Sequence, residues 1–188
     1  MSVAADVKTS GTLTDLGILR AIAVAVLLLG ALVLQSTVLE QVTFLEVTPQ
    51  LALIVVVSLA YLDGPQIGVV TGFAAGFLLD LQLPEQGAVV GITPLLYVLL
   101  AYGVGAMRQY SLSESVWAPV FTVTVVSAIS EFSYAGLSII LGQSWVSLTY
   151  TAKVAGLVVL YNTLLTPFVF PIVRRISSRY APSKVYTV

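Results

Sequence analysis

Six apolar stretches separated by short loops make up most of this sequence, and no other feature restricts its fold as strongly. A helix needs about 20 predominantly apolar residues to cross the hydrocarbon core of a bilayer. Only 9% of the 188 residues are charged, whereas a soluble domain carries about 25%. So few charges cannot cover a surface that faces water, so the sequence predicts an integral membrane protein.

The predicted fold is all-α and polytopic, a single membrane domain with six transmembrane helices. The expected spans are residues 19–39, 49–62, 65–81, 89–107, 115–141 and 154–173. The second and third spans are short and are joined by the turn Asp63-Gly64-Pro65, so they could instead form a re-entrant hairpin. We favour six full spans, because in a hairpin Asp63 would lie deep in the membrane with no evident partner.

The positions of the basic residues predict the orientation, since short cytoplasmic loops are enriched in Lys and Arg. With six spans, both termini lie on one side of the membrane. That side also collects every basic residue except Lys153, namely Lys8, Arg20, Arg108, Arg174, Arg175, Arg179 and Lys184. We therefore expect both termini to be cytoplasmic. The first residues do not resemble a cleavable signal peptide.

The third span carries a glycine at every fourth position, although glycine inside a helix costs about 1 kcal/mol relative to alanine. The series is Gly64, Gly68, Gly72 and Gly76, and the next step reaches Asp80. Positions four apart drift by only about 40° around a helix, so the glycines form one narrow groove. Such a groove lets another helix approach closely. That helix could be a neighbouring span or a segment of another protein.

Asp80 lies at the end of this series and allows two interpretations. Its carboxylate could simply reach the water at the membrane interface. Alternatively, it could make a polar contact with a partner segment or with a neighbouring span. Together with the glycines it would form a plausible contact surface for a partner helix.

The fifth span carries a polar stripe along one helical face, directed at the bundle interior or at a partner. The stripe consists of Thr124, Ser127, Glu131, Tyr134 and Ser138. Glu131 lies well inside the apolar stretch, and an intramembrane carboxylate is by default a candidate functional residue. It could be protonated and bonded to Ser127 or to a nearby span, or it could form a salt bridge with Lys153. Asn162 and Thr166 of the sixth span could supply interhelical hydrogen bonds.

The composition argues against an enzyme. The chain has no cysteine and no histidine, which excludes thiol chemistry, disulfides and the usual zinc or haem sites. No serine has an evident base beside it. The carboxylates Asp80 and Glu131 are too few for a convincing acid–base or metal site. No basic patch interleaved with aromatic residues indicates nucleic-acid binding. We expect no metal and no cofactor.

Several segments resemble the bacterial rod shape-determining MreD family. They are LVLQSTVLEQ, PQLALIVVVSLAYLDGP, QIGVVTGFAAGFLLDL, GITPLLYVLLAYGVGAM and YNTLLTPFVFPIVRRI. The most specific part is a Gly-Pro turn followed by a helix with regularly spaced glycines that ends in Leu-Leu-Asp. The resemblance covers residues 32–176, and the fifth span with Glu131 matches no motif of the family.

The resemblance implies a multi-pass protein of the bacterial inner membrane with no known enzymatic activity. The implied fold is similar to the six-helix substrate-binding component of energy-coupling-factor vitamin transporters. The implied partners are MreC, which has one membrane span, and a wider elongation complex with the actin-like MreB and a peptidoglycan synthase pair. The implied function is a scaffold that supports peptidoglycan synthesis and rod cell shape.

An alternative follows from the same implied fold. The chain could be the substrate-binding membrane subunit of a transporter for a small, vitamin-type molecule. Such a subunit needs a polar pocket near the outer face, which Glu131, Lys153, Asn162 and Trp145 could line. The short outer loops carry few polar groups, and this favours the scaffold.

Overall fold

The computed structural model describes residues 3–39, 47–82, 90–108, 117–142 and 148–179. These residues form six α-helices and one short π-helix: α1 (Val3–Leu34), η1 (Gln35–Leu39), α2 (Leu51–Asp63), α3 (Pro65–Gln82), α4 (Ile92–Met107), α5 (Trp117–Ile140) and α6 (Leu148–Arg179). The all-α prediction is confirmed for this part of the chain. Trp145 and the loops on either side of α4 lie outside the described residues.

Three helical segments are long and apolar enough to cross a membrane: Gly17–Thr37, Trp117–Ile140 and Thr151–Arg179. Two shorter apolar helices are α2 and α4. The outer faces of the long helices expose large apolar side chains, such as Val26, Phe121 and Phe168, which are 64%, 71% and 73% exposed. Contiguous apolar surfaces of this kind mark contact with a membrane or with another protein.

The shortest α-helix, α2, lies at the centre of the bundle and contacts all five of the others. All ten residues from Leu51 to Ala60 are buried. Their sequence, LALIVVVSLA, is apolar on every side, and a helix of that kind has to be buried. With 13 residues, α2 is about 20 Å long, less than the thickness of about 30 Å of the hydrocarbon core.

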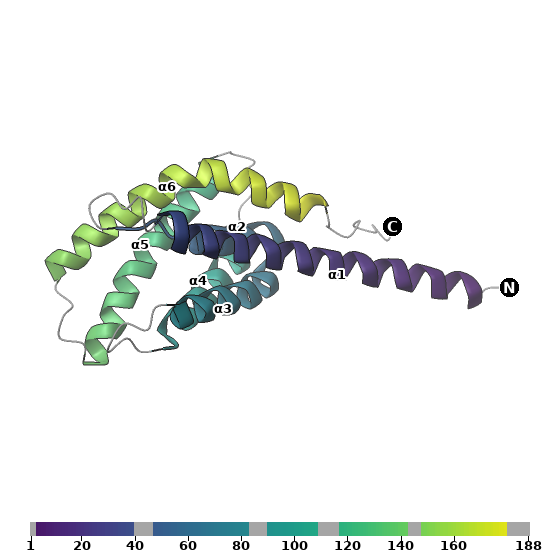
Figure 1. The fold of residues 1–188 in the computed structure, drawn as a ribbon, viewed down its shortest axis with the longest axis horizontal. Helices are drawn as coiled ribbons and strands as arrows, with labels where there is room; N and C mark the ends of the chain where they lie inside the picture. Colours follow the sequence, from purple (N-terminus) through teal and green to yellow (C-terminus); the bar gives the residue numbers. More distant parts are fainter. Residues whose placement is uncertain (1–2, 40–46, 83–89, 109–116, 143–147, 180–188) are drawn as a thin grey trace.

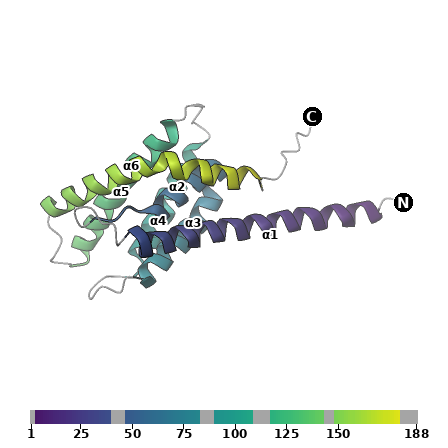
Figure 2. The same ribbon diagram turned by 45° about the horizontal axis from the view of Figure 1, so that its top comes forward.

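The helices next to α2 pack in two antiparallel pairs, α3 with α4 and α5 with α6 (Figure 1). The start of α1 and the end of α6 lie at the same end of the molecule, as Figures 1 and 2 both show. The first half of α1 extends beyond the other helices. Below, this end is called the basic end, because Arg20, Arg108 and Arg175 lie close to it along their helices.

Candidate functional site

The glycine stripe of α3 is the surface on which α4 packs. A Cβ atom at Gly68 would lie 2.7 Å from the Cβ of Ala60 and 3.2 Å from that of Ala101. A Cβ at Gly72 would lie 2.8 Å from the carbonyl oxygen of Tyr97. At Gly76 it would overlap the backbone of Pro94. The stripe therefore permits a backbone-to-backbone approach that no other residue allows.

This packing corrects one of the two interpretations of the stripe. Since α4 already fills it, the stripe has no room for a helix from another protein. The approach is reciprocal, because a Cβ at Gly105 of α4 would overlap the backbone of Pro65. Gly64 has a separate role: its φ of 96° lies in the left-handed region and forms the turn between α2 and α3.

Asp80 contacts the neighbouring span. Its Oδ2 atom accepts a hydrogen bond of 2.6 Å from the backbone N–H of Gly91. Gly91 directly precedes α4 and has a φ of 111°. The carboxylate therefore fastens the end of α3 to the start of α4, the same helix that packs on the glycine stripe.

A partly buried polar cluster surrounds Gln50 at the start of α2. The backbone N–H of Gln50 donates to Oδ1 of Asn162 over 2.9 Å, and its side-chain Nε2 donates to Oε1 of Glu131 over 2.6 Å. The Nδ2 atom of Asn162 donates in turn to the hydroxyl of Ser127 at 2.9 Å. Three of the intramembrane polar residues singled out in the sequence, Ser127, Glu131 and Asn162, thus meet in one network.

The cluster exists because α2 begins inside the bundle. The first N–H groups of a helix have no partner within the helix, and leaving them buried without an acceptor is costly. Asn162 supplies an acceptor for Gln50, and Oε1 of Gln35 accepts from the N–H of Ala52 at 3.1 Å. A carboxylate such as Glu131 is also favourable near the positive end of a helix dipole.

Two sequence expectations about this region are wrong. Glu131 forms no ion pair with Lys153, whose side chain is exposed near the start of α6. Lys153 lies nine residues before Asn162, about 13 Å along the helix axis. The hydroxyl of Thr166 donates to the carbonyl of Asn162 within α6 rather than to another helix. Thr163 makes the interhelical bond instead, to Thr124 at 2.8 Å.

A second polar contact lies near the basic end. Arg20 of α1 forms an ion pair of 2.6 Å with Asp63, and Ser177 of α6 donates to the same carboxylate oxygen at 2.6 Å. The side chain of Asp63 is 5% exposed and that of Arg20 is 20% exposed. This contact was not predicted from the sequence, where Asp63 was considered only as a residue that a re-entrant hairpin would leave without an evident partner. Three helices therefore converge at the turn after α2.

These arrangements hold helices together and show no reactive constellation. The described residues contain no group of three or more His, Cys, Asp or Glu that could hold a metal ion. Of the residues proposed to line a transporter pocket, Glu131 and Asn162 are bonded to Gln50, and Lys153 is exposed. One cavity lies between α4 and α5, and a smaller one lies between α5 and α6.

The decisive comparison is with protein families. A family model described as rod shape-determining protein MreD matches residues 17–176 of the chain. The chain belongs to the MreD family. The match includes every helix described above except the first part of α1 and the end of α6. No curated protein and no solved structure matches the chain. Family membership assigns this bundle to the determination of rod cell shape, in a membrane context.

Proposed function

We propose that the chain is a non-enzymatic scaffold of the cell elongation machinery in the bacterial inner membrane, where it binds MreC and supports peptidoglycan synthesis. The observation that carries this proposal is the family match over residues 17–176. It agrees with a bundle whose conspicuous polar residues, Glu131, Asn162 and Asp63, are used in contacts between helices. We therefore propose that the protein acts by binding other proteins of the elongation machinery.

The proposed topology has six spans with both termini in the cytoplasm. It is supported by Asp63, which has a cationic partner close to the basic end. In a re-entrant hairpin the turn at Gly64 would lie near the middle of the membrane. Asp63, next to this turn, contacts Arg20 and Ser177, and Ser177 is two residues from the end of α6. These contacts favour a position of the turn near the cytoplasmic surface.

The proposed partner is MreC, and through it MreB and the peptidoglycan synthase pair. Because α4 occupies the glycine stripe, the partner helix has to use another face of the bundle. The exposed apolar faces of α1, α5 and α6 are available for such a contact. The similarity to the energy-coupling-factor components remains part of the proposal.

The transporter alternative is weaker in this structure than in the sequence. Two of the four residues expected to line its polar pocket are Glu131 and Asn162. Both side chains are engaged with Gln50, and Asn162 is completely buried. No further observation in the described bundle favours this alternative.

The test is a tagged pull-down from native membranes in mild detergent, with every co-purifying protein identified. We expect a single-span protein with a large extracytoplasmic domain, with or without the wall synthases. A multi-span coupling protein together with cytoplasmic ATPases would overturn the proposal in favour of the transporter. An unrelated polytopic protein, tagged and expressed at the same level, is the control for non-specific recovery.

A further inference from the structure

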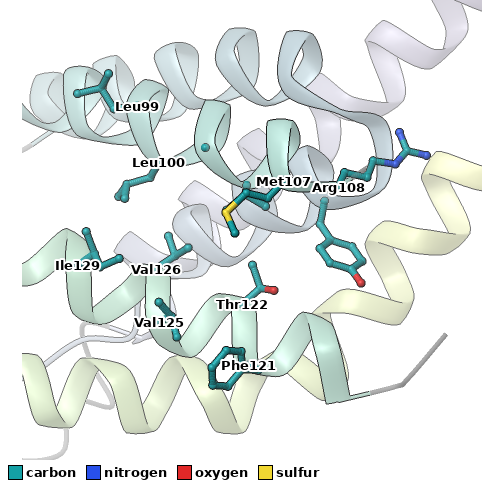
Figure 3. Close-up of a pocket in the computed structure, with 12 residues that line it drawn as sticks. Leu99, Leu100, Met107, Arg108, Phe121, Thr122, Val125, Val126 and Ile129 are labelled. Carbon is teal, nitrogen blue, oxygen red and sulfur yellow. The ribbon is translucent and has the colours of Figure 1, made fainter. Parts of the chain in front are cut away.

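An open groove runs between α4 and α5 (Figure 3), and Tyr61 of α2 is also among the residues that line it. Its volume is about 420 Å³, within the usual range of ligand pockets, about 300–1,000 Å³. The walls are mainly apolar, with side chains such as Leu99, Val104, Val125 and Ile129. Several of them are well exposed, so the groove opens to the surroundings of the bundle and not to its interior.

The groove has one charged end. Figure 3 shows Arg108 beside Met107, where α4 ends, and Phe121 opposite, near the start of α5. Arg108 is exposed, and among the residues that the structure describes no carboxylate pairs with it. The hydroxyl of Thr122, also in the wall, is already bonded to the carbonyl of Ala118. Arg108 is therefore the polar group of the groove that is ready to bind an anion.

The length of the groove indicates its occupant. From Leu99 to Arg108 the wall rises nine residues, about 13 Å. Half of a bilayer core is about 15 Å thick. The groove thus extends over one leaflet, whereas a helix of a partner protein would need a contact surface over both. An apolar slot one leaflet long with a guanidinium at its interfacial end complements an anionic phospholipid, since Arg binds phosphate groups well.

We propose that the groove between α4 and α5 is a binding site for one anionic phospholipid, with an acyl chain against α4 and α5 and the phosphate on Arg108. The site goes beyond the scaffold function and does not depend on a protein partner. If both termini are cytoplasmic, as proposed above, Arg108 and the site lie in the cytoplasmic leaflet.

Gly103 provides a direct test, because it lines the groove and a Cβ there would meet nothing within 4 Å. Gly103→Leu should place an apolar side chain in the slot, and its Cβ meets no other atom of the protein. Gly136 of α5 also has nothing within 4 Å of an added Cβ but does not line the groove. Gly136→Leu is therefore the matched control. Arg108→Gln removes the charge and leaves the apolar walls intact.

The experiment is a titration of the purified, delipidated protein with phosphatidylglycerol or with phosphatidylcholine of the same chains, with bound lipids counted by native mass spectrometry. For the wild type and Gly136→Leu we expect about five-fold tighter binding of one phosphatidylglycerol, the factor expected for one basic residue at an anionic surface. Arg108→Gln should abolish the preference and retain chain binding. Gly103→Leu should weaken the binding of both lipids.

Three results would overturn the proposal: wild-type protein that binds both lipids equally, an undiminished preference in Arg108→Gln, or unchanged binding in Gly103→Leu. A photo-crosslinking residue in place of Val125, used in native membranes, distinguishes a lipid in the groove from a helix of another protein. A lipid adduct supports the site, and an adduct to a protein helix refutes it. Failure of the MreC pull-down would leave these outcomes unaffected, so the two proposals can be judged separately.

Discussion

Glu131 is held inside the bundle by an amide and not by a cation. Its Oε1 atom accepts a hydrogen bond from Gln50, which lies 81 residues away in the sequence. A hydrogen bond to an amide requires an acceptor oxygen, and Gln carries one as well as Glu does. The structural role of Glu131 should therefore survive the loss of its charge.

We expect Glu131→Gln to unfold at nearly the same denaturant concentration as the wild type in detergent micelles. Glu131→Leu leaves the partly buried side-chain amide of Gln50 without its acceptor and should cost about 1–3 kcal/mol. Phe132→Leu is the control, because it introduces a leucine at an exposed position of the same helix without removing a hydrogen bond. Equal losses for Gln and Leu would mean that the charge itself is required.

The ion pair between Arg20 and Asp63 is the second residue-scale feature with a measurable cost. Removing one partner of a buried pair costs about 3–5 kcal/mol, whereas apolar replacement of both is often nearly neutral. We expect Arg20→Met to be strongly destabilising in equilibrium unfolding. The double variant Arg20→Met/Asp63→Leu should recover most of the loss. Costs that simply add would show that the two side chains are not coupled.

At the scale of elements, the contact between α3 and α4 depends on missing side chains. Gly76→Ala would drive a Cβ into the backbone of Pro94, and overpacking of this kind costs about 1–3 kcal/mol. Gly136→Ala adds a Cβ in open space and should stabilise α5 by up to about 1 kcal/mol. Unfolding in detergent should therefore give effects of opposite sign. A stabilising Gly76→Ala would mean that the stripe is open to another helix after all.

The elements themselves were largely predictable, because apolar segments and regular glycine spacing are local properties of the sequence. The expected second span, residues 49–62, is close to α2 (Leu51–Asp63). The sixth is longer than expected, since α6 runs from Leu148 to Arg179 and hydropathy detects only its apolar part. At both ends, α6 continues beyond the expected span into more polar residues, which can lie outside the hydrocarbon core.

The contacts between elements were not predictable in the same way. Gln35 and Gln50 gave no signal in the sequence, because their role depends on where α2 begins inside the bundle. Gln50 and Asn162 are 112 residues apart, and nothing local to either residue indicates the other. Asp63 and Arg20 could have been matched, since in a six-span topology both lie at cytoplasmic ends of their spans. Two isolated, opposite charges expected at the same depth in the membrane would have predicted this ion pair.

At the scale of the whole molecule, the position of the turn at Gly64 separates six full spans from a re-entrant hairpin. The chain contains no cysteine, so single cysteines can be introduced without background. Gln66 and Gln82 are exposed near opposite ends of α3, about 24 Å apart along its axis. If α2 and α3 cross fully, these two positions face opposite sides of the membrane.

We expect a membrane-impermeant thiol reagent to label Gln82→Cys in intact cells. Gln66→Cys should react only after the membrane is opened, as should the reference Ser178→Cys at the exposed end of α6. In a re-entrant hairpin, Gln66→Cys would lie near the middle of the bilayer and stay unlabelled in both preparations, while Ser178→Cys would still react. Labelling of Gln66→Cys in intact cells would reverse the orientation and place Arg108, together with the groove between α4 and α5, in the outer leaflet.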